Sequence, residues 1–75
     1  MSYRISQKML QEIGKNIQKT RKQQKKKQLD IAVDAGIEYS YYTKIERGEA
    51  KNPSLSKMYA IFRSLGVKST DILPF

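Results

Sequence analysis

The sequence predicts an all-α domain of five short helices. Apolar residues recur at spacings of three and four along most of the chain, which is the period of an amphipathic helix. Glycine or proline ends several of these stretches, and no segment alternates apolar and polar residues as a half-buried strand would. A chain of 75 residues has room for one domain with one small core.

The first helix is expected to follow a short arm of residues 1–5 and to extend from Ser6 to about Gln24. Ser6 is a favoured N-cap residue, because its hydroxyl can accept a hydrogen bond from the first turn. A run of lysines then breaks the helical pattern. The residues expected on the core side of this helix are Met9, Leu10, Ile13, Ile17 and Thr20.

The second and third helices are separated by Gly36, which suits the left-handed conformation that often follows a helix. The third helix is expected to stop at Gly48. Tyr42 is expected in the core, since an aromatic side chain on an apolar face usually packs there. The inward residues would be Ile31, Ala32 and Ala35 from the second helix, with Ile37, Tyr42 and Ile45 from the third.

The last two helices follow a loop that ends at Asn52 and Pro53. Ser54 is expected to cap the fourth helix and Gly66 to end it. Ser69 is expected to cap a short fifth helix, which Pro74 would prevent from continuing far. The core stripe of the fourth helix would consist of Leu55, Met58, Ile61 and Leu65.

Positive charge dominates the composition. Fifteen lysines and arginines oppose seven acids, and the segment from Lys15 to Lys27 carries seven cations and no acid. Such a segment attracts polyanions, with nucleic acid as the first candidate and an anionic membrane surface as the second. A basic face that is merely solvated is the alternative interpretation of the same pattern.

Several functional classes are disfavoured by the residues that the chain lacks. It has no histidine and no cysteine, so the commonest general base and the usual metal ligands are missing. No carboxylate pair has a partner suited to catalysis. We therefore expect no enzymatic activity, no catalytic residue, no metal, no cofactor and no small-molecule ligand. No apolar stretch is long enough to span a membrane, and the absence of cysteine fits a cytoplasmic location.

Residues 28–47 form a helix, a glycine-containing turn and a second helix. When two short helices are joined in this way, the later one, here the third helix of the chain, can enter a groove, and the major groove of B-DNA is wide enough for it. For this role the third helix needs one face of apolar anchors and an outer face of hydrogen-bonding side chains. That outer face would consist of Tyr39, Ser40, Thr43 and Lys44.

Five segments of the chain resemble the lambda-repressor/Cro-like (XRE-type) helix-turn-helix family, and the spacing between Gln28 and Pro53 matches that family without a gap. The segments are IGKNIQKTRKQ, QLDIAVDAGI, YYTKIERGE, NPSL and LGV. The resemblance covers about residues 13–73. It implies a lambda-repressor-like DNA-binding domain over residues 6–75, in which helices 2 and 3 form the helix-turn-helix at about residues 28–47.

The resemblance also implies roles for individual residues. Gln28 would bind a phosphate and brace the recognition helix, and Arg21 would form a buried ion pair with Glu46. Tyr39, Ser40, Thr43 and Lys44 would contact base edges. The other candidates for phosphate contact are Tyr41, Lys51, Asn52 and Ser54, together with Lys25, Lys26 and Lys27, which lie in the turn between helices 1 and 2.

Four positions depart from the family pattern. Lys27 occupies the place of the usual Ser or Thr cap of the second helix, and Lys26 replaces an apolar turn residue. Glu38 replaces the usual cap of the recognition helix, where its charge suits the helix N-terminus but would be repelled by nearby phosphates. Phe62 replaces a small residue of the fourth helix.

Tyr59, Phe62, Leu73 and Phe75 provide more apolar surface than one small core requires. Exposed apolar surface usually marks a contact site, and the family often binds DNA as a dimer. These residues are therefore candidates for a homodimer interface through helices 4 and 5. The alternative is that Phe62 and Phe75 close the core of a monomer.

The function expected from the sequence is that of a sequence-specific regulator of transcription that binds double-stranded DNA. The recognition helix, about residues 39–46, would lie in the major groove, and a homodimer would bind a palindromic operator. Restriction–modification controllers, repressors of phages or mobile elements, and antitoxins all fit the pattern. A protein–protein adaptor that kept the fold is the main alternative, and a membrane-surface protein with a basic amphipathic helix is a third.

Overall fold

The computed structural model describes residues 6–73, and the predicted arm of residues 1–5, Pro74 and Phe75 lie outside the described residues. Within the described part the chain forms five helices and no strand. The all-α prediction and the number of helices are therefore confirmed. The helices are α1 (Gln7–Gln23), α2 (Gln28–Ala35), α3 (Tyr39–Arg47), α4 (Leu55–Leu65) and α5 (Ser69–Ile72).

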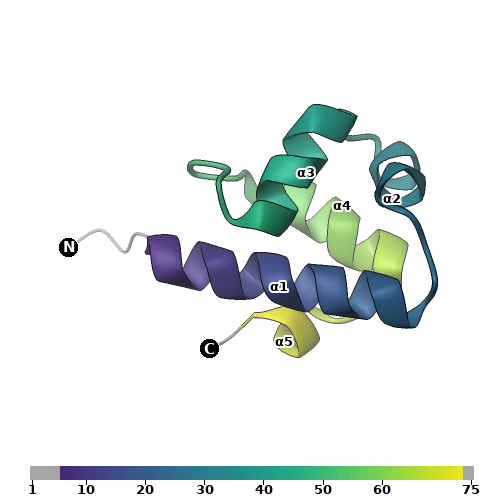
Figure 1. Ribbon diagram of the computed structural model, residues 1–75, viewed down its shortest axis with the longest axis horizontal. Coiled ribbons are helices and arrows are strands. Elements are labelled where there is room, and N and C mark those ends of the chain that lie inside the picture. The colour runs from purple at the N-terminus through teal and green to yellow at the C-terminus, as the bar shows by residue number, and fades with distance from the viewer. Residues whose placement is uncertain (1–5, 74–75) are drawn as a thin grey trace.

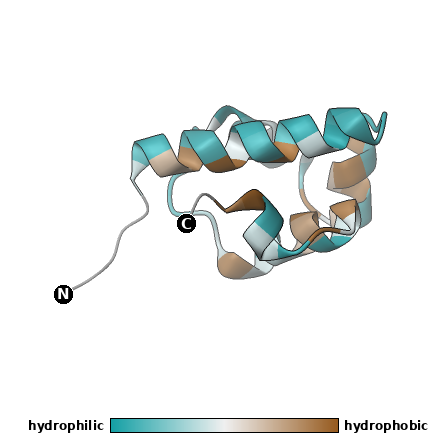
Figure 2. Cartoon of the chain, turned by 90° about the horizontal axis from the view of Figure 1, so that it is seen from below, coloured by the Kyte–Doolittle hydropathy of each residue, from teal (hydrophilic) through white to brown (hydrophobic). Residues whose placement is uncertain are grey.

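The long helix α1 supports the rest of the fold (Figure 1). Helices α3, α4 and α5 each pack against α1, and α2 packs on α3 and α4 without lying along α1. Hydrophilic residues cover the outer side of α1, whereas its hydrophobic residues face the other helices (Figure 2). None of the described helices is long and apolar enough to cross a lipid bilayer.

Most residues predicted to face inward do so. Ile13 and Ile17 of α1 meet Ile31 of α2, Tyr42 of α3 and Ile61 of α4 in one cluster, and each of these side chains is at most 1% exposed. Met9 and Leu10, at the start of α1, are only half-buried. The other members of the core are Ala32, Ile37, Ile45, Ala50, Met58, Phe62, Leu65 and Ile72.

Two apolar residues of α4 differ from expectation. Leu55 was predicted in the core but is 85% exposed, because it begins the helix, where α4 has not yet reached its neighbours. Phe62 was a candidate for the dimer interface but is only 5% exposed. It packs one turn after Met58 in the core of a single chain, so the prediction that it lies exposed at an interface is wrong.

α1 approaches α3 closely because it carries glycine at position 14. A Cβ atom there would lie 2.4 Å from the carbonyl oxygen of Glu46 and 2.6 Å from that of Ile45. Both distances are far below van der Waals contact, and both acceptors belong to the backbone, which cannot rotate away as a side chain can. The position of α3 on α1 therefore depends on the absence of a side chain at Gly14.

Side-chain amides of α1 and of its C-cap residue, Gln24, satisfy carbonyl groups at the C-terminal ends of three other helices. Gln7 donates to the carbonyl of Gly48 after α3, Asn16 to that of Ile72 in α5, and Gln24 to that of Leu65 in α4, each over 2.7 Å. The last carbonyls of a helix have no partner within the helix. These three contacts therefore fix where α3, α4 and α5 end relative to α1.

The helix N-termini are capped in two ways. Ser6 and Ser54 accept hydrogen bonds from backbone N–H groups three residues later, over 3.1 and 3.2 Å. These two predicted caps are confirmed. Ser69 was also predicted as a cap, but α5 begins one residue earlier: Lys68 is the N-cap residue, and its backbone N–H donates to Asp71 over 3.0 Å.

The start of α2 uses the same arrangement. The backbone N–H of Lys27 donates to the carboxylate of Asp30 over 3.0 Å. Asp30, the third residue of the helix, thus binds back to the N-cap residue, which is the half of a capping box that the N3 side chain supplies. Its charge also suits the helix N-terminus. The departure at Lys27 leaves this helix intact.

Candidate nucleic-acid interface

α3 separates its buried and exposed residues cleanly. Tyr42, Ile45 and Glu46 are buried, whereas Tyr39 is 48% exposed and Ser40 and Lys44 are exposed. Thr43 is half-buried, and its hydroxyl donates to the carbonyl of Ser40 over 2.8 Å. Three of the four candidates for base contact therefore lie on the outer face, while the hydroxyl hydrogen of the fourth is used within the helix.

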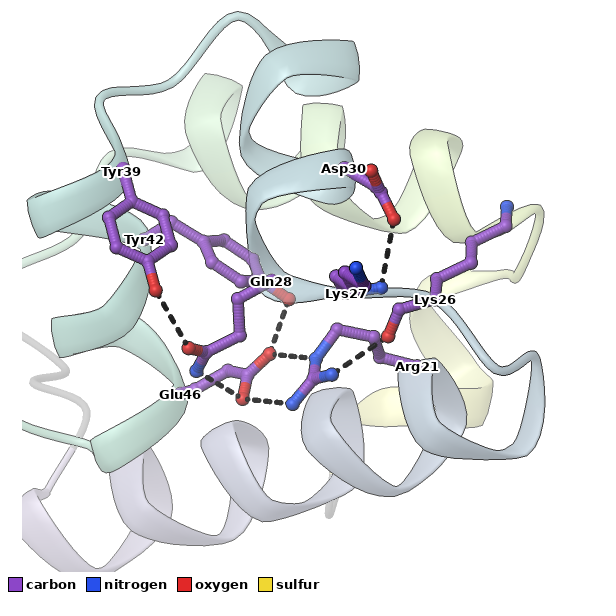
Figure 3. A network of polar contacts seen from close by, with 8 residues as sticks. All are labelled: Arg21, Lys26, Lys27, Gln28, Asp30, Tyr39, Tyr42 and Glu46. Atoms are coloured by element: carbon purple, nitrogen blue, oxygen red, sulfur yellow. Dashed lines mark hydrogen bonds and ion pairs between the residues drawn. The ribbon is translucent and has the colours of Figure 1, made fainter.

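The inner face of α3 is attached to α1 by an ion pair (Figure 3). Nε of Arg21 donates to Oε2 of Glu46 over 2.6 Å, and Nη2 donates to Oε1 over 3.1 Å. The third nitrogen of the guanidinium, Nη1, donates to the backbone carbonyl of Lys26 over 2.8 Å. The ion pair is thereby linked to the turn that carries Lys25, Lys26 and Lys27.

Glu46 accepts two further hydrogen bonds. The hydroxyl of Tyr42 donates to Oε2 over 2.5 Å, and the amide Nε2 of Gln28 donates to Oε1 over 3.0 Å. No side-chain nitrogen or oxygen that is buried in the described part of the chain lacks a hydrogen-bond partner. The network therefore satisfies a buried charge completely, which is the condition for tolerating one.

The pKa values of this network are shifted in the directions that keep it intact. Burial alone would raise the pKa of Glu46, but the hydrogen bonds from Arg21, Tyr42 and Gln28 outweigh it and lower that pKa below its ordinary value of 4.5. Burial, together with the neighbouring Glu46 carboxylate, raises the pKa of Tyr42 well above its ordinary value. Glu46 is thus ionised and the Tyr42 hydroxyl protonated at neutral pH.

Gln28 connects this buried network to the surface. Its side-chain oxygen accepts a hydrogen bond from the hydroxyl of Tyr39 over 3.4 Å, while its nitrogen donates to Glu46 (Figure 3). The first residue of α2 is thereby joined to both the beginning and the end of α3. This is the bracing contact that the resemblance implied for Gln28.

The candidates for phosphate contact flank α3 on two sides. Lys25, Lys26 and Lys27 are exposed in the turn before α2, and Lys25 has a positive φ of 57°. The candidates on the other side precede α4, where Lys51, Asn52 and Ser54 are exposed. Glu38, the acid at the start of α3, is also exposed and makes no capping hydrogen bond with its side chain.

Lys57 belongs to the same surface but was missed by the sequence argument. Its ammonium nitrogen lies 4.2 Å from the centre of the Tyr41 ring, an arrangement that orients the cation through the electron-rich face of the ring. Tyr41 is on α3 and Lys57 on α4. Only the tertiary packing brings the two together, so no spacing in the sequence could have indicated the contact.

A second surface lies on α4 and α5, where an apolar groove has a volume of about 720 Å³. It is lined by Tyr59, which is 63% exposed, by Leu55, which is 85% exposed, and by the half-buried Leu73. Phe62 contributes from the core side. The remaining lining residues are Ile13, Pro53, Ser56, Met58 and Ser69.

The fold is that of a helix-turn-helix DNA-binding protein. A helix-turn-helix family model matches residues 17–72. The chain belongs to this family, in its XRE/Cro-like branch, and is a DNA-binding regulator of transcription. The family and the fold are regulatory rather than enzymatic. Comparison with curated proteins gives no match.

The solved structures that share the fold include two restriction-modification controller proteins. The restriction-modification controller protein C.AhdI from Aeromonas hydrophila superposes with a TM-score of 0.80 at 23% identity, over 85% of this chain and 96% of that one. A tyrosine-to-phenylalanine variant of the restriction-modification controller protein C.Esp1396I superposes with a TM-score of 0.75 at 22% identity, over 83% of this chain and 77% of that one. At these identities the likeness concerns the fold.

Proposed function

We propose that this protein binds specific sequences of double-stranded DNA by placing α3 in the major groove. The observation that carries the proposal is the division of α3 into two faces. Its inner face is fixed to α1 and α2 by the network around Glu46, and its outer face presents Tyr39, Ser40 and Lys44 to solvent. A rigid helix with free polar side chains on its outer side is what base contacts in the major groove require.

The charges around α3 support the same proposal. Exposed lysines precede α2 and α4 on either side of the recognition helix, and the whole chain carries a formal net charge of +8. Phosphate contacts from such residues supply affinity and set the orientation of the protein on the duplex, while base contacts supply specificity. Lys57, held against the ring of Tyr41, joins the candidates for phosphate contact.

The groove on α4 and α5 supports binding as a homodimer. Each chain would offer an apolar groove whose walls include the exposed side chains of Leu55 and Tyr59. A surface that contains both a hollow and exposed apolar side chains can be self-complementary about a two-fold axis. Two copies related in this way would bind two half-sites one helical turn apart, about 34–36 Å, so the operator would be a palindrome.

The proposal is tested by selecting bound sequences from a random pool of duplex DNA. We expect one enriched motif with two inverted half-sites and tighter binding to it than to a scrambled duplex. In the same selection, Lys44→Ala should change the enriched motif. Lys15→Ala is its control, because it removes an exposed lysine of α1 and so makes the same change in charge. Equal binding to all sequences would overturn the proposal and favour a basic adaptor that lacks sequence specificity.

A further inference from the structure

The hydrogen bonds that connect Glu46 to Tyr39 have a fixed direction. An ionised carboxylate can only accept, so Gln28 must turn its amide N–H group toward Glu46, over 3.0 Å. The amide oxygen of Gln28 then points the other way, toward the hydroxyl of Tyr39, at 3.4 Å. Because an amide oxygen has no hydrogen, Tyr39 must be the donor in this contact.

This direction determines what Tyr39 can offer to DNA. A tyrosine hydroxyl has a single hydrogen, and here that hydrogen is directed at Gln28. The oxygen keeps a lone pair, and the side chain is 48% exposed on the outer face of α3. In this state Tyr39 can accept a hydrogen bond from DNA but cannot donate one.

Few groups on DNA can donate to such an oxygen. Phosphate oxygens only accept, and so do N7 and O6 of guanine and O4 of thymine. The donors that the major groove displays are the N6 amino group of adenine and the N4 amino group of cytosine. A Tyr39 hydroxyl held in this way therefore cannot form its hydrogen bond with the phosphate backbone.

We infer that Tyr39 is a specificity-determining residue that accepts a hydrogen bond from the amino group of adenine or cytosine, and that Gln28 sets this preference from behind the recognition helix. The inference rests on the proposed function, because it requires α3 to lie in the major groove. Glu46 participates without touching DNA: as a pure acceptor it orients the amide of Gln28, and Gln28 in turn orients the hydroxyl of Tyr39.

The test uses the sequence selected by the parent protein. At each position of both strands, adenine or cytosine is replaced by an analogue that lacks only the exocyclic amino group. At one position per half-site the parent should lose about three- to tenfold in affinity, the value of one hydrogen bond. Tyr39→Phe should bind the normal and the modified duplex equally at that position.

Gln28→Met tests the role of the amide, because methionine has a similar length and no oxygen to hold the hydroxyl. In this variant the freed Tyr39 hydroxyl can donate, so the discrimination at the same position should fall below threefold and guanine or thymine should be tolerated there. Gln23→Met is the matched control, since it makes the same change at an exposed glutamine of α1 and leaves the amide of Gln28 in place. Circular dichroism should show the same helical content for all three variants.

Three results would overturn the inference while the proposed function stands. In the first, binding depends on both an amino group and Tyr39 at no position of the site. In the second, the position that depends on Tyr39 is occupied by guanine or thymine, and in the third, the Gln28→Met variant keeps the base preference of the parent. If the parent selects no sequence at all, the proposed function fails, and the inference fails with it.

Discussion

Arg21 of α1 and Glu46 of α3 are in bidentate contact, with Nε 2.6 Å from Oε2 and Nη2 3.1 Å from Oε1. The two side chains are 9% and 1% exposed, so water screens their interaction little. A buried pair adds little to stability compared with an apolar one, but loss of one partner leaves an uncompensated buried charge. The contact therefore makes the position of the recognition helix depend on both residues.

Replacing Glu46 with alanine should destabilise the protein strongly. The variant leaves the guanidinium of Arg21 buried without its counter-ion, which typically costs about 3–5 kcal/mol. For a domain of this size that corresponds to a loss of at least about 12 °C in melting temperature. Glu49→Ala is the matched control: it removes an acid paired with Arg47 at 3.3 Å on the surface, where both side chains are more than half exposed. Equal melting of Glu46→Ala and the parent would contradict the prediction.

The same carboxylate should make stability depend on pH in the acid range. The pKa of Glu46 is lower in the folded protein than its ordinary value of 4.5. Its contribution is therefore fully present above that value and is lost as the pH falls through the lower, folded pKa. Urea unfolding between pH 7 and pH 2 should show the parent losing more stability below about pH 4.5 than Glu46→Gln, which cannot titrate. Parallel pH profiles would show that the pKa is unshifted.

Gly14→Ala should displace α3 from α1. Alanine is favoured over glycine within a helix by about 1 kcal/mol, but its Cβ would meet the backbone carbonyls of Ile45 and Glu46. We expect a net loss of roughly 1–3 kcal/mol, as for other overpacked sites, together with weaker binding to DNA. Gly66→Ala is the control: its Cβ meets nothing within 4 Å, although its positive φ imposes a local cost. That variant should lose stability but bind DNA normally while folded.

The sequence predicted the helices well because each helix is specified by residues close together in the chain. Ser6 and Ser54 cap their helices, and Gly36, Gly48 and Gly66 follow helix ends in the left-handed conformation. Lys68 was missed as a cap because Asp71, rather than the cap residue, supplies the oxygen. A capping interaction can be reversed in this way without any change in the helical pattern.

The details of burial and of the site depended on neighbours that no local pattern contains. Leu55 and Phe62 both lie on the apolar side of α4, and only the position of that helix on its neighbours exposes one and buries the other. The contact between Tyr41 and Lys57, and the direction of the hydrogen bond from Tyr39, depend on how three helices pack. The family pattern implied the ion pair, but the partners that complete it became visible only in the structure.

Tyr59→Lys should convert a homodimer into a folded monomer. The lysine would place a charge at the apolar groove on α4 and α5, where a second copy is proposed to bind, and burying an unpaired charge is unfavourable. We expect weaker binding to the palindromic operator with unchanged helical content. Val33→Lys is the control, because Val33 is 71% exposed on α2 and lies outside the groove.

Sedimentation over a range of concentrations measures this effect. The parent and Val33→Lys should dimerise, whereas Tyr59→Lys should not. Phe62→Lys is unsuitable for this purpose, because Phe62 is a core residue and its replacement should unfold the chain. If the unmodified protein sediments as a monomer at every accessible concentration and on its operator, the proposed interface is not used.

The last prediction separates residues that select a sequence from residues that attract any duplex. Ser40→Ala and Lys44→Ala remove outer side chains of α3 and should change which bases are preferred, since a good base contact contributes about 1–3 kcal/mol of discrimination. Lys26→Ala, Lys51→Ala and Lys57→Ala should instead weaken binding to all sequences about equally. Each should also reduce the slope of log K against log salt by roughly one unit, because each removes one phosphate contact and the counterion that it releases.

Salt titrations and sequence selection on each variant distinguish the two classes. Should Ser40→Ala and Lys44→Ala retain the parental preference and only lower the salt slope, the outer face of α3 contacts phosphates, and the bases must be contacted from elsewhere.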